Sequence, residues 1–167
     1  MEASPGRDRA RVDLLQSALR ARGELDLEAE GDSMRPAIRS GQRITVSLAA
    51  PGSLKVGDIV QILSGAETLV HRIVRIGPEG LLLTKGDGLL IFDAPVRGTE
   101  VLGRVTAVEG RPPRAGRLLA LLSCLQGTLY LWTMRNPLGR RLGELKFRFV
   151  RRSLVLSFNT LLGRLFR

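Results

Sequence analysis

The region from residue 24 to residue 110 alternates between short apolar-polar repeats and Gly- or Pro-containing breaks. Segments such as "QRITVSL" and "ETLVHRIVRI" have the two-residue period and β-branched content of half-buried strands. The sequence "GPEG" turns the second of these back into "LLLTK", which predicts a β-hairpin. About six strands are expected, at residues 24–30, 42–48, 59–63, 67–76, 81–85 and 100–110. The pattern predicts a mainly β fold, a small folded-over sheet or barrel.

The flanking regions have a different character and predict helices. Residues 1–23 include an amphipathic stretch from about Arg9 to Arg22. "RPPRAG" at 111–116 ends the strand region, and the composition then changes to Leu and Arg. We expect one helix over about 117–135 and one or two basic amphipathic helices from Leu138 onward. The predicted organisation is an N-terminal helix (1–23), a β domain (24–110) and a basic helical tail (111–167).

Charge is distributed unevenly along the chain. Residues 111–167 hold 12 Lys and Arg and one acid, Glu144, whereas residues 1–110 hold 14 Lys and Arg against 15 acids. Such a tail favours an anionic partner. The low aromatic content, 4%, does not favour a stacking surface for nucleic acid. We therefore expect peripheral contact of residues 117–167 with an anionic membrane, or packing of this tail on the β domain or on a partner protein.

No membrane-crossing or cofactor-binding segment is predicted. The N-terminus lacks the apolar core of a signal peptide, and the most apolar stretch, residues 118–132, is shorter than the roughly 20 residues of a single span. A cytoplasmic or peripheral membrane location is expected. One cysteine, Cys124, and one histidine, His71, exclude an intrachain disulfide and a metal site built from several of these residues.

Four polar residues could form a hydrolytic site. Ser33 lies in the turn "GDSMRP", and a serine hydroxyl needs a base to act as a nucleophile at neutral pH. His71 is the side chain suited to that role, and a carboxylate would have to orient it. Asp87 in "TKGDG" and Asp93 in "LLIFDAPV" are the two candidates. Taken singly, each has a simpler interpretation, as a turn, packing or capping residue.

The order of these motifs resembles that of a known superfamily. "GDSMRPAIRSGQRITV", "VGDIVQI", "LVHRIVRI", "LLLTKGDGLLIFDAPV" and "VLGRVTAV" resemble, in order, the blocks of the signal peptidase I superfamily, which includes the LexA-type self-cleaving repressors. The resemblance covers about 24–108, roughly half of the chain. Histidine stands where bacterial signal peptidases and LexA-type proteins have a catalytic lysine. In this respect the chain is similar to the archaeal and endoplasmic-reticulum-type enzymes, which use serine, histidine and aspartate.

The resemblance implies a serine endopeptidase that cleaves a peptide or precursor protein, without a cofactor. Ser33 would be the nucleophile and His71 the general base, with Asp87, or by a looser match Asp93, as the orienting acid. Lys85, in the same block as Asp87, would be a solvated hairpin residue.

Three residues around Ser33 are expected to support it. Gly31, two residues before the serine, has no hydroxyl that could assist, while Met34 and Pro36 would shape the turn. Backbone N–H groups of this turn would stabilise the oxyanion. Apolar strand residues would line a cleft in which an extended peptide binds as an added strand. The family prefers small residues before the cut.

Two other functions are compatible with the same fold. A LexA-like regulator would cleave itself and bind DNA through its tail, although the N-terminus has no evident helix-turn-helix. A non-catalytic peptide-binding module would have no need of the Ser33, His71 and aspartate set.

Overall fold

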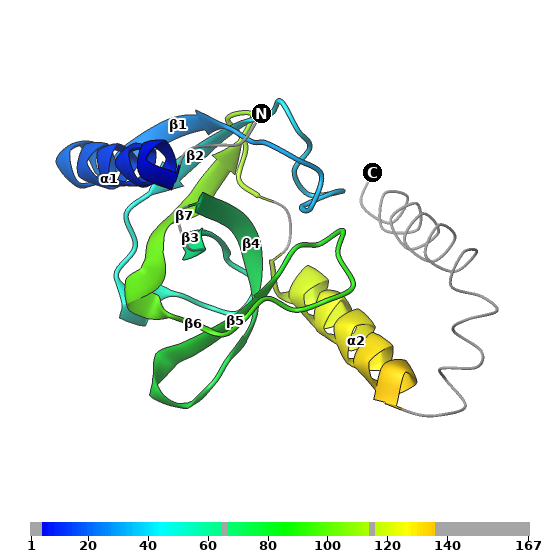
Figure 1. The fold of residues 1–167 in the computed structure, drawn as a ribbon. Helices are drawn as coiled ribbons and strands as arrows, with labels where there is room; N and C mark the ends of the chain where they lie inside the picture. The colour runs from blue at the N-terminus through cyan, green and yellow to red at the C-terminus, as the bar shows by residue number, and fades with distance from the viewer. Residues whose placement is uncertain (1–4, 65–66, 114–115, 136–167) are drawn as a thin grey trace.

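The chain folds around one antiparallel sheet of seven strands, with a helix at each end of the described region (Figure 1). A computed structural model describes residues 5–64, 67–113 and 116–135. The strand order in the sheet is β1-β2-β7-β3-β4-β5-β6. The elements are α1 (Pro5–Arg22), β1 (Glu24–Glu28), β2 (Arg43–Ser47), β3 (Ile59–Ser64), β4 (Glu67–Ile76), β5 (Leu81–Lys85), β6 (Val96–Arg97), β7 (Val101–Val108) and α2 (Gly116–Arg135).

The mainly β fold is confirmed, but the barrel alternative is wrong. The first strand, β1, pairs only with β2, and the last in order, β6, pairs only with β5, so the described sheet is open with two edges. The predicted hairpin is present as β4 and β5, with Arg72 opposite Lys85 and Ile76 opposite Leu82. The two-residue strand β6 was not predicted, because it is too short to show a period.

Apolar side chains cover both faces of the sheet. Ile59 and Val60 are neighbours on β3, are both buried, and belong to two different apolar clusters. The first cluster also contains Leu19 of α1 and Met34 of the serine turn. Successive side chains of a strand point to opposite faces, so burial of both explains why the "IVQIL" segment is apolar almost throughout.

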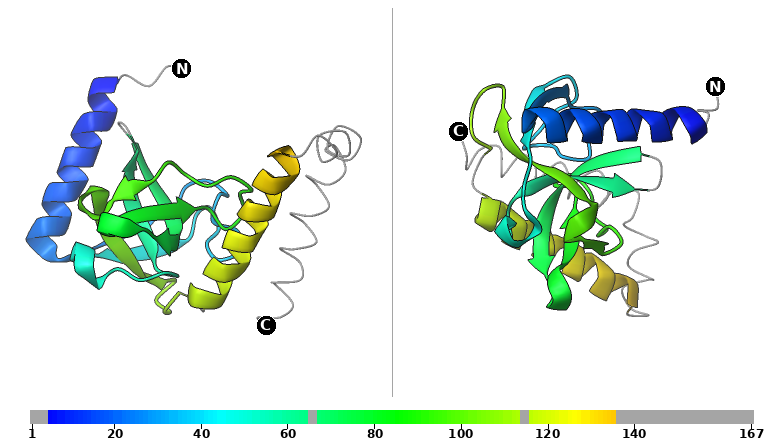
Figure 2. Two further views of the ribbon diagram at one scale, coloured as in Figure 1. Left: turned by 90° about the horizontal axis from the view of Figure 1, so that it is seen from below. Right: turned by 90° about the vertical axis from the view of Figure 1, so that its left-hand side faces the viewer.

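The helices lie on opposite sides of the sheet (Figure 2). The first, α1, ends at Arg22 and is followed by Gly23, which adopts a left-handed φ of +78° and donates its N–H to the Leu19 carbonyl. The second, α2, begins one residue before the predicted start and ends at the predicted Arg135. The helix predicted from Leu138 onward lies outside the described residues. Neither α1 nor α2 is long and apolar enough to cross a membrane.

Candidate active site

Ser33, His71 and Asp93 form a continuous hydrogen-bonded chain. The Ser33 Oγ lies 3.1 Å from His71 Nε2, and His71 Nδ1 lies 2.7 Å from Asp93 Oδ2. An ionised carboxylate only accepts hydrogen bonds, so Nδ1 of the neutral ring carries the proton and Nε2 is free to accept the serine hydroxyl. Residues far apart in the sequence are thus brought together in the arrangement that nucleophilic activation requires.

Asp93, rather than Asp87, contacts the histidine, which reverses the order of preference from the sequence motifs. The segment after β5 returns toward that strand, and the Asp93 N–H donates to the Thr84 carbonyl at 2.9 Å. The Thr84 hydroxyl in turn donates to Asp93 Oδ2 at 2.7 Å. Thr84, fully buried, was missed by the sequence reasoning, although it stands within the quoted "TKGDG". It holds the carboxylate oxygen that faces His71.

Asp87 is engaged by a buried arginine that the sequence analysis did not single out. Arg72 donates from Nε and Nη2 to the two carboxylate oxygens of Asp87, both at 2.8 Å, and from Nη1 to the Gly57 carbonyl at 2.7 Å. Both charged side chains are almost completely buried. This paired, bidentate geometry satisfies charges that would otherwise be costly to bury.

The Asp87 loop braces the serine turn. Gly88 donates its N–H to the Ser33 carbonyl at 2.8 Å. A Cβ on Gly86 would lie 2.6 Å from the same carbonyl oxygen and 3.0 Å from His71 Nε2, so only glycine allows this approach. The Arg72–Asp87 pair therefore positions a loop that touches both Ser33 and His71.

Breaking this ion pair is expected to destabilise the fold strongly. The Arg72→Met variant leaves the Asp87 carboxylate buried without its partner, and the free energy of unfolding should fall by about 3–5 kcal/mol. Urea denaturation followed by circular dichroism measures the loss. The double variant Arg72→Met/Asp87→Leu removes both charges and should recover part of it. A single variant as stable as the wild type would contradict a structural role for the pair.

The residues around Ser33 occupy the positions that a tight turn requires. Gly31 has a left-handed φ of +76°, where a side chain would be strained. Met34 is buried in the core cluster that contains Leu19, which anchors the turn to the sheet. Pro36 follows within the same turn, and the Arg35 N–H donates to the Asp32 carbonyl at 3.2 Å.

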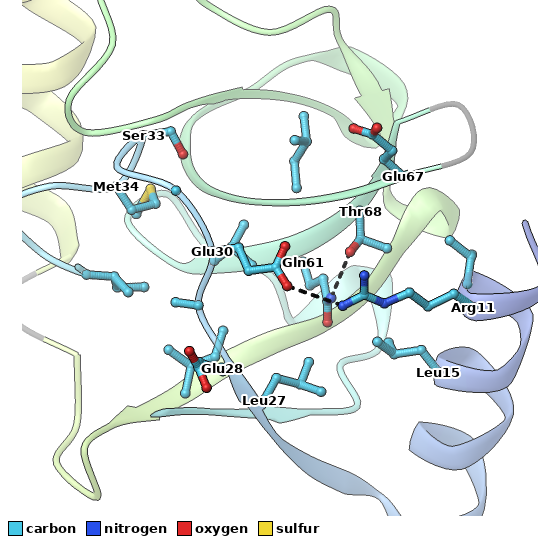
Figure 3. A pocket seen from close by; sticks show the side chains of 17 residues that line it. Arg11, Leu15, Leu27, Glu28, Glu30, Ser33, Met34, Gln61, Glu67 and Thr68 are labelled. Atoms are coloured by element: carbon cyan, nitrogen blue, oxygen red, sulfur yellow. Dashed lines mark hydrogen bonds and ion pairs between the residues drawn. The ribbon is translucent and has the colours of Figure 1, made fainter. Parts of the chain in front are cut away.

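A pocket of about 420 Å³ opens beside Ser33 (Figure 3). Its apolar lining includes Leu27, Met34 and Leu69, and charged residues at its border include Arg11, Glu30 and Glu67. Arg11 reaches across from α1 to Glu30, with 3.4 Å between Nη2 and Oε1. The site therefore has an apolar recess next to the serine hydroxyl, of the kind that side chains of a bound substrate can occupy.

One wall of the pocket is a strand segment with an unpaired edge. On one side, β4 pairs with β3 from Glu67 to Arg72. On the other side β5 begins to pair only at Arg72, so within the described sheet residues 67–70 have a single strand neighbour. The same four residues line the pocket. Their backbone groups are available to an extended chain lying in the pocket.

Lys85 is completely buried, so the prediction that it is a solvated hairpin residue is wrong. The reason is α2, which packs over the end of β5. The Lys85 Nζ donates to Ser123 Oγ at 2.8 Å, to Gln126 Oε1 at 3.2 Å and, more weakly, to the Gly86 carbonyl at 3.4 Å. Burial lowers the pKa of Lys85 from 10.5 to about 8, against the opposing charges of Asp87, Asp93 and Cys124.

This lowered pKa predicts a pH-dependent stability. Below pH 8 the lysine is protonated in both the folded and the unfolded chain. Between about pH 8 and 10.5 the unfolded chain holds a proton that the folded chain has released, so the free energy of unfolding should rise with pH. Denaturation curves across this range should show the rise in the wild type and not in Lys85→Met. If the unfolding free energy changes with pH in the same way in both proteins, the lowered pKa is contradicted.

The described residues contain no group of three or more His, Cys, Asp or Glu side chains that could hold a metal ion. No sequence profile of a known protein family matches the chain, and no curated protein matches it.

Proposed function

We propose that the protein is a serine endopeptidase of the signal-peptidase type, which cleaves a peptide or precursor protein. The observation that carries the proposal is the chain of hydrogen bonds from Ser33 through His71 to Asp93. Its support from the sequence is the ordered set of motifs in residues 24–108. The signal peptidase/LexA fold is part of the proposal, and an open, mainly β sheet is compatible with it.

In the proposed reaction, Ser33 Oγ attacks the carbonyl carbon of the scissile peptide bond while His71 Nε2 takes the hydroxyl proton. Asp93 stabilises the resulting imidazolium through Nδ1. The backbone N–H groups of the serine turn are the proposed donors to the oxyanion. The imidazolium then protonates the leaving amine, and a water activated by the same histidine hydrolyses the acyl-enzyme ester.

The substrate is proposed to lie as an extended strand along residues 67–70 of β4. This places alternate side chains of the peptide toward the apolar recess next to Ser33, because successive side chains of a strand point in opposite directions. Arg11, which spans the pocket to Glu30, would have to share this space with the bound chain. The border also carries Glu28 and Glu67, so basic groups of a substrate would be attracted to this rim.

Incubation with a library of precursor peptides tests the proposal. The full-length wild type should produce defined fragments by mass spectrometry, and Ser33→Ala should produce none. Ser17→Ala is a suitable control, since it makes the same chemical change at an exposed serine of α1 that bonds to the Asp13 carbonyl and is not among the residues lining the pocket. If Ser33→Ala yields the same fragments as the wild type, Ser33 is not the nucleophile and the proposal fails.

The same experiment separates the alternatives. A LexA-like regulator would cut its own chain, and the mass of the wild type would change with time in the absence of any added peptide. A non-catalytic binding module would retain the library peptides without cleaving them.

A further inference from the structure

Leucine side chains form an exposed stripe along the outer face of α2. Leu118, Leu121, Leu125 and Leu129 recur at intervals of three and four residues, and their side chains are 49%, 56%, 58% and 61% exposed. Residues at this spacing lie on one face of a helix. A water-facing helix surface normally carries charged side chains instead, so the leucine stripe indicates an apolar partner.

The opposite face of α2 is fixed to the protein body. Ser123 and Gln126 accept hydrogen bonds from the buried Lys85. Gly127 lies against Phe92, where a Cβ would come within 2.4 Å of the ring, so the helix packs closely here. The helix is therefore held with Ser123, Gln126 and Gly127 inward and the leucine stripe outward. It cannot bury the stripe by rotating without breaking the Lys85 hydrogen bonds to Ser123 and Gln126.

The charge pattern around the stripe points to an anionic partner. The 17 residues between Arg117 and Arg135 contain no charged side chain, and α2 has no acid. The sequence after α2, residues 136–167, contains eight Lys and Arg, one acid and 14 large apolar residues.

We propose that α2 is an interfacial helix, which lays its leucine stripe into the headgroup region of an anionic membrane. The leucines enter the apolar boundary, and the Lys and Arg residues that the sequence carries after Arg135 supply the positive charge that lipid phosphates attract. The helix is proposed to lie in the membrane plane, because it is not long and apolar enough to cross. Because Lys85 and Gly86 connect α2 to the candidate active site, membrane binding also holds Ser33 in a defined orientation to the surface.

Flotation of the full-length protein with lipid vesicles tests this proposal without measuring activity. The wild type should bind vesicles that contain phosphatidylglycerol more strongly than pure phosphatidylcholine vesicles, and added salt should weaken the difference. The Leu121→Ser and Leu125→Ser variants should each lower the partition coefficient about tenfold. Leu14→Ser is the matched control, since Leu14 is 72% exposed on α1, across the sheet from α2, and should bind as the wild type does.

A fluorescent label gives an independent readout. An environment-sensitive dye on Leu125→Cys, in a Cys124→Ser background, should shift to the blue on vesicles, whereas the same dye on Leu14→Cys should not.

Three results would overturn the proposal. Absence of vesicle binding by the wild type is one. A leucine variant that melts several degrees lower but binds vesicles normally would indicate that the chain's own tail covers the stripe. If the wild type is a dimer that does not bind vesicles, and Leu125→Ser converts it to a monomer, then a second copy of the chain covers the leucine stripe. None of these results bears on whether Ser33 cleaves peptides, so the two proposals fail separately.

Discussion

Replacing His71 with alanine is expected to lower kcat/KM for peptide cleavage by about 10⁴-fold or more, because the Ser33 hydroxyl loses the acceptor for its proton. In the structure, Nε2 of His71 is the group 3.1 Å from Ser33 Oγ that can take the proton. The measurement is the rate of cleavage of a peptide selected from the library. Thermal melting of the same variant shows how much of the loss comes from removing a buried ring.

A double variant separates a catalytic role from a structural one. If His71 acts through Ser33, then Ser33→Ala/His71→Ala should be no slower than Ser33→Ala alone, because residues that act as a unit are not additive. If His71 only supports the fold, its loss should reduce whatever rate Ser33→Ala retains. Multiplied effects in the double variant would contradict the proposed roles.

Replacing Asp93 with asparagine is expected to lower kcat by about 10⁴-fold with a much smaller change in KM. The Asp93 carboxylate fixes the proton on His71 Nδ1, and an amide group turned toward the ring would move it to Nε2, where it blocks transfer from Ser33. Removing the Thr84 hydroxyl with Thr84→Val should cost about tenfold, since one of two bonds to the carboxylate oxygen remains. Steady-state kinetics on one peptide gives kcat and KM for the wild type, Asp93→Asn and Thr84→Val.

Asp87 provides the matched comparison for Asp93. Asp87→Asn weakens the buried pair with Arg72, so it should lower the unfolding free energy more than Asp93→Asn does. At temperatures where Asp87→Asn is folded, its kcat should be closer to that of the wild type than the kcat of Asp93→Asn is. If Asp87→Asn is instead stable and inactive while Asp93→Asn is active, the assignment of the two acids is reversed.

The secondary structure follows largely from local patterns that the sequence displays directly. The strand β4 begins and ends where its alternating pattern predicts, and α2 occupies the predicted helix to within one residue. The prolines and glycines that separate the segments act locally, through their own backbone angles, and so their effect can be read without tertiary information. The strand β6 escaped prediction because two residues carry no period.

By itself, the sequence determined the mainly β body, the helices next to it, and Ser33 and His71 as the residues to examine. Only the tertiary structure decided which aspartate meets the histidine, because the loop between β5 and β6 folds back through the Asp93–Thr84 bond while Asp87 pairs with Arg72. It also buried Lys85, since α2 covers a residue some 40 positions earlier in the chain. These outcomes depend on contacts between segments that are distant in the sequence. Local propensities and residue spacings do not show which distant segments will meet.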